Sequence, residues 1–364
     1  MAKNANLNKA KDKKVDEFYT RRSDIENELS YYSEHFKGKT VYCNCDDPEW
    51  SEFWQFFRRN FKPWGLKKLI ATHYEPDEKN YAYMLEISED TNGDGVVDWK
   101  DEPTITQIPC NGDFRSAYCI GLLKQADIIV TNPPFSLWRQ YIQQLFEYKK
   151  KFLIIGSENN LSYNEIFHYV QDNEMWIGYT HPKIFRVPDG STGKSVYMED
   201  GICYQKFGNV CWYTNLDIKK RHDFIDLRGN YYNKDDFPML DNYPAIYVKR
   251  VSDIPCDYEG IMGVPISYLS QYNPEQVQLL GIVSAPKNQG SLNLGKDYSK
   301  YIGHKQSGEL NGRTGSTFGR NAVLIGDDGH HDYYEYNGVR VQSVYPRAFI
   351  KLKNPESRRY INED

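Results

Sequence analysis

The residues whose types and spacing could do chemistry begin with Asn132, Pro133, Pro134 and Phe135. They follow residues 126–131 (ADIIVT), an apolar run typical of a buried strand. Two prolines cannot continue a strand, and the first holds Asn132 extended, so we expect a rigid turn. The Asn132 side-chain oxygen and the Pro133 carbonyl could accept the two N–H bonds of an amino group, while Phe135 stacks on the attached ring. An ordinary strand-ending turn is the alternative, but the helical pattern that follows and the aromatic fourth residue favour a functional turn.

This segment is similar to the motif of amino-group methyltransferases that use S-adenosylmethionine. An exocyclic amine on adenine is a poor nucleophile, because its lone pair is delocalised into the ring. Two acceptors that favour a pyramidal nitrogen help most when positive charge develops there, so they stabilise the transition state. A base in a duplex cannot reach such a turn while it is paired, so the target base must be flipped out.

Alternating strand and helix patterns must position this turn. Strands are predicted at residues 38–45, 65–74, 126–131 and 150–157, and helices at 49–61, 114–125, 136–149 and 162–172. This alternation predicts a parallel sheet covered on both faces, with the ligand site beyond the carboxyl ends of the strands. From about residue 174 onward, short β-prone runs predict a β-richer region. These runs are residues 175–179, 209–216, 245–249, 322–326 and 340–352.

Composition restricts the class of protein. The chain has 364 residues, a formal charge of −5 and a mean hydropathy of −0.73. It contains no apolar run long enough to span a membrane and no apolar run after its basic start, so we expect neither a membrane segment nor a secretory signal. Its seven cysteines are spread out rather than dense, which favours a reducing cytoplasmic location. Monomer and dimer remain equally possible.

Further segments resemble the EcoRI-type adenine-specific DNA methyltransferases. The resemblance implies an S-adenosylmethionine-dependent enzyme that methylates N6 of adenine in double-stranded DNA, from a bacterium or its phage. It also implies a doubly wound, Rossmann-like class I methyltransferase sheet of the α/β class. The similar segments are residues 16–20, 25–36, 41–53, 65–72, 112–116, 126–138, 150–157, 212–217 and 257–276.

The resemblance implies a set of cofactor contacts that precede the Asn132 turn. Residues 16–20 (DEFYT) match the motif that closes over the methionine part of the cofactor, although a helix entry with buried aromatic residues is the alternative. In residues 42–48 (YCNCDDP), carboxylates suit a cationic sulfonium, but the expected glycines are missing. An acid after the second strand often binds ribose hydroxyls, and a solvated loop carboxylate is equally possible there. The expected contacts are Phe18, Tyr19, Thr20, Asn44, Asp46, Asp47, Tyr74 (stacking on adenine), Glu75 (ribose), Asp113 (adenine amino group) and Phe114 (adenine ring).

Residues 90–101 (DTNGDGVVDWKD) have the ligand spacing of a calcium-binding EF-hand loop, with Asp in place of the final Glu. The loop lies in an apparent insertion, residues 76–104. A structural calcium ion or another hard cation is one interpretation, and an acidic glycine turn between two strands is the other. The predicted ligands are Asp90, Asn92, Asp94, Val96 (through its carbonyl), Asp98 and Asp101.

Two basic segments are candidates for contact with DNA. Residues 1–15 hold five lysines and one acid, and are either a phosphate-contacting arm or a simple tail. Residues 286–321 hold six Lys or Arg, two acids and seven glycines, which suits a flexible loop that reads base edges or phosphates. An ordinary surface loop is the alternative. The predicted DNA contacts are Lys300, Lys305, Arg313, Thr314, Ser316, Thr317 and Arg320.

These observations predict a basic arm over residues 1–15 and a cofactor-binding catalytic domain over 16–180. Residues 181–364 would recognise the target sequence and complete the fold. Because the Asn-Pro-Pro-Phe chemistry serves several amino groups, three other acceptors remain open at this point: N4 of cytosine, adenine in RNA, and a glutamine amide of a protein. A catalytically inactive DNA-binding relative is a further alternative.

Overall fold

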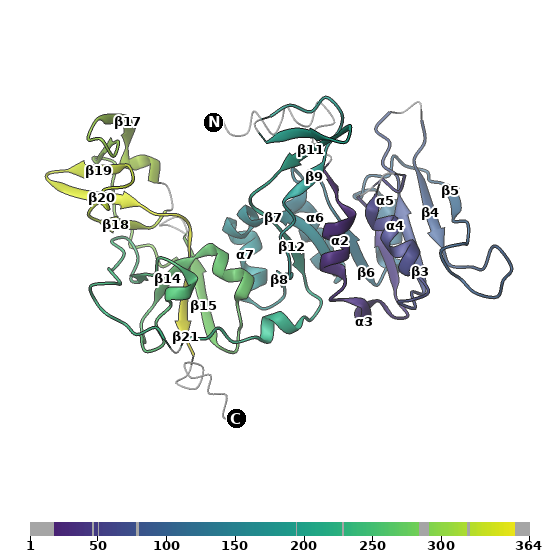
Figure 1. Ribbon diagram of the computed structural model, residues 1–364, viewed down its shortest axis with the longest axis horizontal. Coiled ribbons are helices and arrows are strands. Elements are labelled where there is room, and N and C mark those ends of the chain that lie inside the picture. Colours follow the sequence, from purple (N-terminus) through teal and green to yellow (C-terminus); the bar gives the residue numbers. More distant parts are fainter. Residues whose placement is uncertain are drawn as a thin grey trace. The chain divides into compact units, whose positions relative to one another are not determined.

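The computed structural model describes residues 18–353 except 46, 50, 78–79, 194, 228, 284–290 and 319–320. Its contacts divide the chain into two compact units (Figure 1). Unit 1 comprises residues 1–160 and 175–218, and unit 2 comprises residues 161–174 and 219–364. None of the described helices has the length and apolar character needed to span a membrane.

Unit 1 is built around an eight-stranded sheet with the order β5-β4-β3-β2-β6-β7-β12-β8. Its middle strands β3, β2, β6 and β7 are parallel, as the alternating pattern predicted, while β4, β5, β12 and β8 add antiparallel pairs at the two ends. The strands are β2 (Thr40–Cys43), β3 (Lys68–Thr72), β4 (Tyr83–Ile87), β5 (Thr104–Gln107), β6 (Ile128–Thr131), β7 (Lys151–Ser157), β8 (Trp176–Ile177) and β12 (Val210–Thr214).

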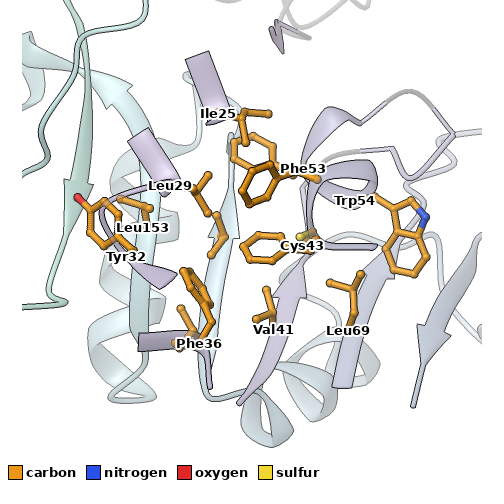
Figure 2. Close-up of a cluster of buried hydrophobic side chains, with 14 of the residues drawn as sticks. Ile25, Leu29, Tyr32, Phe36, Val41, Cys43, Phe53, Trp54, Leu69 and Leu153 are labelled. Carbon is orange, nitrogen blue, oxygen red and sulfur yellow. The ribbon is translucent and has the colours of Figure 1, made fainter. Parts of the chain in front are cut away.

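Helices cover both faces of this sheet. On one face, Ile25 of α2, Phe53 of α4 and Val41 of β2 meet in one large apolar core (Figure 2). On the other face, Trp138 of α6 lies 4.7 Å from Tyr213 of β12, measured between ring centroids. Ser51 and Ser116 cap the first turns of α4 and α5 by accepting backbone N–H groups. The helices are α2 (Arg22–Leu29), α3 (Ser33–Phe36), α4 (Glu52–Asn60), α5 (Ala117–Gln125) and α6 (Trp138–Glu147).

A small second sheet also belongs to unit 1. Its order is β1-β9-β11-β10, and every pair in it is antiparallel. This sheet ties the start of the described chain, β1, to residues far along the sequence. Its strands are β1 (Tyr19–Thr20), β9 (Ile184–Arg186), β10 (Val196–Glu199) and β11 (Ile202–Lys206).

Unit 2 is rich in β-structure and contains two sheets. One has the order β13-β14-β21-β15 and the other β17-β16-β19-β20-β18. The elements are α7 (Asn164–Gln171), β13 (Ile246–Tyr247), β14 (Met262–Pro265), β15 (Val277–Ile282), β16 (Ile302–His304), β17 (Leu310–Thr314), β18 (Val323–Ile325), β19 (Tyr333–Tyr336), β20 (Val339–Ser343) and β21 (Arg347–Leu352). Short 3₁₀ helices are η1 (Glu158–Ser162), η2 (Lys219–His222), η3 (Val251–Asp253), η4 (Ile266–Gln271) and η5 (Gly315–Phe318).

The fold is therefore mixed α/β with a β-rich C-terminal part. Two details differ from the sequence predictions. The β-prone run 340–352 is not one strand: it is divided between β20 and β21, which lie in different sheets, and Pro346 between them has no N–H to donate. The supposed flexible loop 286–321 contains β16, β17 and η5, because Tyr298 and Phe318 pack into a small core.

Candidate active site

The Asn132 turn lies at the carboxyl end of β6, next to the carboxyl ends of β2 and β7. β6 is fully buried, and Asn132 itself is only 7% exposed. The turn is closed by a hydrogen bond from the Leu137 N–H to the Pro134 carbonyl, 3.0 Å, immediately before α6. A turn at the carboxyl end of a central strand thus positions Asn132, as its sequence indicated.

The N-terminal segment packs directly on this turn. The Asn132 side-chain nitrogen donates a hydrogen bond to the Phe18 carbonyl. The Phe18 and Phe135 rings lie 5.5 Å apart, centroid to centroid. This contact joins residues 114 positions apart, and it fixes the orientation of the Asn132 amide.

Phe207 is a residue that sequence reasoning missed. Its ring lies 4.8 Å from the Phe18 ring and 6.3 Å from the Phe135 ring, and it also contacts Phe185 of β9. Phe207 occupies the short connection between β11 and β12, where no periodic pattern marks it. A hydrogen bond from its N–H to the Lys183 carbonyl, 2.8 Å, holds the connection in place. The asparagine turn is therefore flanked by three aromatic rings, only two of which were expected.

Two of the buried polar atoms without a partner in the described structure belong to predicted cofactor residues. Asn44, 3% exposed, accepts a hydrogen bond from the Tyr141 hydroxyl, but its side-chain nitrogen has no partner. The Thr20 hydroxyl, on β1, is likewise buried without a partner. Since buried polar groups are nearly always hydrogen-bonded, these two atoms are available to bond to a ligand or to water.

The loops after β2 and β3 meet through a pair of side chains. Asp47 lies 3.0 Å from His73, and the His73 ring stacks on Tyr83 at 4.8 Å. His73 was not singled out from the sequence. Glu75 accepts the Asp77 N–H and the Asn80 side chain, so its carboxylate is bonded to its own loop. The neighbouring Tyr74 is 48% exposed.

The loop that carries Asp113 lies against the end of β3. The Glu75 N–H donates to the Asn111 carbonyl, 2.9 Å. Gly112 has a φ of +80° and approaches the His73 carbonyl so closely that a Cβ there would lie 2.1 Å from the oxygen. Only glycine fits this position without rearrangement.

Asp113 is already partnered in the protein. Its two carboxylate oxygens bind the Arg115 guanidinium at 2.8 and 2.5 Å. The hydrogen bond from Arg115 lowers the pKa of the Asp113 carboxyl, which stays ionised. Phe114, 5% exposed, packs edge-on against Tyr141. Arg115 and Phe114 also line an open pocket of about 240 Å³ between α5 and α6.

The acidic loop 90–101 is closed by its own hydrogen bonds. The fully buried Asp101 carboxylate accepts the N–H groups of Thr91, Asn92 and Asp98. Asp90 accepts those of Gly93 and Gly95, at 2.6 Å each. In the part of the chain that the structure describes, no three His, Cys, Asp or Glu side chains are grouped so as to hold a metal. The remaining predicted ligands, Asn92, Asp94, Val96 and Asp98, lie along the same turn.

The predicted DNA contacts lie in unit 2, around β16, β17 and η5. Lys305 pairs with Glu309 at 3.0 Å, and Lys300 lies 6.0 Å from the Tyr336 ring centroid. Arg313 is exposed near the end of β17. The hydroxyls of Thr314 and Ser316 bond to each other at 2.5 Å, and Thr317 bonds to the Thr314 carbonyl. The predicted arm 1–15, Asp46 and Arg320 lie outside the described residues.

The seven cysteines form no disulfide.

Comparison with known proteins identifies one family. Residues 6–326 match the family model described as adenine-specific methyltransferase EcoRI. The chain is 43% identical over 298 residues to the type II methyltransferase M.EcoRI of Escherichia coli, covering 77% of this chain and 90% of that protein. It is 38% identical over 288 residues to M.MgeORF184P of Mycoplasma genitalium (77% and 87%) and 38% identical over 290 residues to M.MpnI of Mycoplasma pneumoniae (77% and 86%), both type II methyltransferases. No solved structure matches.

Proposed function

Because the chain belongs to the EcoRI family of adenine-specific methyltransferases, we propose that it transfers the methyl group of S-adenosylmethionine to N6 of a flipped-out adenine in DNA. The observation that carries the mechanism is the buried Asn132 turn, held by β6 and by Phe18. Family membership implies use of the cofactor, which supplies an electrophilic methyl group on a sulfonium.

Asn132 and Pro133 would hold the amino group. With the Asn132 nitrogen directed at Phe18, the side-chain oxygen acts as one acceptor and the Pro133 carbonyl as the other. Both hydrogen bonds strengthen as N6 becomes positive, so they stabilise the transition state more than the bound base. After methyl transfer the extra proton on N6 leaves to water.

Phe135 and Phe207 would hold the ring of the flipped base. Both rings border the turn, and the Phe18 ring contacts them at 5.5 and 4.8 Å, centroid to centroid. Stacking on aromatic side chains is worth about 1–3 kcal/mol per base, which offsets part of the unstacking that base flipping requires.

The residues of unit 1 fit the proposed cofactor. The unpartnered Thr20 hydroxyl and Asn44 side-chain nitrogen offer polar contacts near the Asn132 turn, since Phe18 and Cys45 of the same segments bond to Asn132 and Thr131. Phe114 would cover the adenine ring, and Asp113 would share its carboxylate between Arg115 and the adenine amino group. Asp47 would lie near the cationic sulfonium of the cofactor, and Glu75 would bind its ribose hydroxyls. Tyr19, Tyr74 and Asp46 remain in the proposal on the strength of the resemblance.

The strand order and the helices on both faces support a doubly wound class I methyltransferase sheet, to which β4 and β5 add an antiparallel edge. The proposed division of labour assigns cofactor binding and catalysis to the first part of the chain and target recognition to the β-rich part. Lys300, Lys305, Arg313, Thr314, Ser316, Thr317 and Arg320 are its proposed DNA contacts, and a cytoplasmic location belongs to the same proposal.

We also propose that the acidic loop, residues 90–101, binds a structural calcium ion. This proposal rests on the spacing of its ligands in the sequence alone. Calorimetric titration with Ca²⁺ should release or absorb heat and raise the melting temperature. A titration without heat, together with an unchanged melting curve, would leave the loop as a self-bonded turn.

The direct test identifies the methylated base and compares the methylation rate of wild type with that of a variant. DNA from a host that expresses the protein is sequenced for methylated positions, and purified protein is then incubated with labelled cofactor and unmethylated DNA carrying that site. N6-methyladenine should be the product, and Asn132→Ala should reduce the rate by at least about 100-fold. Asn27→Ala, at an exposed position on α2, is the matched control and should keep full activity. Another methylated base, or an active Asn132→Ala, would overturn the proposal.

A further inference from the structure

Arg347, at the start of β21 in unit 2, is a buried cation without an acidic partner. It is 4% exposed, and its Nε is buried with no hydrogen-bond partner. Its side chain has one hydrogen bond, from a terminal nitrogen to the Tyr247 hydroxyl at 3.0 Å. Its guanidinium carbon lies 4.7 Å from the Tyr247 ring centroid. Among the described residues no carboxylate pairs with it.

Such a charge is costly to bury. Burial lowers the pKa of the Arg347 guanidinium, but arginine stays protonated in proteins, so the charge persists. A buried ion without a counter-ion loses much of its solvation, and a single hydroxyl and an aromatic ring offset that loss only in part. In the same unit, the charge of Arg340 is neutralised by two acidic partners, Asp327 at 3.0 Å and Glu335 at 2.9 Å.

Arg347 is the first residue of β21, an interior strand of its sheet, so it lies at a strand end. Its register partner is Pro265, the last residue of β14, and Tyr247 is the last residue of β13. Three strand ends therefore converge there. Tyr247, Pro265 and Ile266 are each partly exposed, so the strand ends around the guanidinium reach the surface.

We propose that Arg347, held by Tyr247, binds a phosphate group of the DNA backbone. The proposal rests on the proposed function, which supplies a polyanionic substrate. A guanidinium presents paired N–H donors that match phosphate oxygens. One phosphate would neutralise the charge of Arg347 and accept a hydrogen bond from its unpartnered Nε. The contact would orient the duplex on unit 2 without reading its sequence. It also lies beyond residue 326, where the family match ends.

The test compares Arg347→Met with Arg340→Met, which removes a guanidinium that already has two acidic partners. Affinity for a short labelled duplex is measured between about 0.05 and 0.2 M salt, because each phosphate contact adds about one to the slope of log affinity against log salt. Arg347→Met should reduce that slope by about one and weaken binding roughly tenfold at ~0.1 M salt, equally for specific and unrelated duplexes. Arg340→Met should leave the slope unchanged.

A second measurement separates binding from folding. Replacing an uncompensated buried charge by an apolar side chain should leave the melting temperature of the free protein equal or higher. If Arg347→Met fails to fold, Arg347→Gln answers the question, since it also removes the charge but keeps a hydrogen-bonding side chain, and it should lower the salt slope by about one in the same way.

An unchanged slope and affinity in a folded Arg347→Met variant would overturn the inference. That outcome differs from a failure of the proposed function, in which the wild-type protein would not methylate adenine at all.

Discussion

At the level of single residues, burial determines how much a polar side chain of the candidate site contributes to ligand binding. An exposed asparagine or threonine exchanges its hydrogen bonds with water at little net change, whereas a buried, unpartnered one carries a desolvation cost of about 1–3 kcal/mol. Asn44 and Thr20 each have one such buried atom. A cofactor that bonded to these atoms would recover the desolvation cost, so both residues should contribute to its affinity.

Truncating either side chain should therefore weaken cofactor binding. Thr20→Val should do so without destabilising the free protein, whereas Asn44→Ala also removes the acceptor of the buried Tyr141 hydroxyl and should lower the melting temperature. Asn44→Ala and Thr20→Val are each expected to lower the affinity for S-adenosylmethionine about 5- to 50-fold, which corresponds to one lost hydrogen bond to a buried group. Calorimetric titration gives the affinity, and thermal melting of the free variants is the control. Affinities within twofold of wild type would contradict the assignment.

Among the elements, α2 has an unusual anchor. Glu28 is fully buried and accepts hydrogen bonds from the Tyr32 hydroxyl and from the N–H groups of Tyr179 and Thr180. Gly178 leaves it room, since a Cβ there would lie 2.2 Å from a Glu28 oxygen. This carboxyl clamps α2, which directly follows the β1 segment on the Asn132 turn, to the connection after β8.

The clamp should make stability depend on pH. Burial raises the pKa of the Glu28 carboxyl, so the folded state holds its proton more tightly than the unfolded chain. The resulting stabilisation is complete below the unfolded value of about 4.3 and is lost as pH rises through the folded value.

Comparing melting temperatures of wild type and Glu28→Gln across this range isolates the group. Because glutamine does not titrate, the wild-type advantage should shrink as the pH rises. Parallel curves for the two proteins would show that Glu28 ionises as it does in the unfolded chain.

At the scale of the whole molecule, the chain beyond residue 326 is essential to unit 2. The family match ends at that residue, yet β19, β20 and β21 follow it. All three are interior strands: β21 lies between β14 and β15, and β19 and β20 lie between β16 and β18. The net charge of −5 therefore says little about DNA binding, because the candidate basic groups are concentrated locally in a unit that these strands hold together.

Ending the chain after Gly326 should abolish DNA methylation. Both sheets of unit 2 would lose central strands, and the loss of their hydrogen bonds and buried side chains exceeds the usual stability of a domain. Circular dichroism should report lost β-structure and gel-shift titration lost DNA binding. A chain that ends after Lys353 is the control and should behave as wild type. An active protein that ends at Gly326 would show that the three strands are dispensable.

The sequence by itself predicted the turn at Asn132–Phe135, the parallel strands around it and the β-rich second part, because these depend on local patterns of burial and on residue types. It could not place Phe207 beside Phe135, His73 beside Asp47, or the Asn132 amide on Phe18. It did not indicate that Asp113 pairs with Arg115, or that Arg347 is buried without an acidic partner. Those relations join segments distant along the chain or depend on how burial removes partners. Only the packing of the tertiary structure decides which side chains meet and which polar atoms are left without a partner.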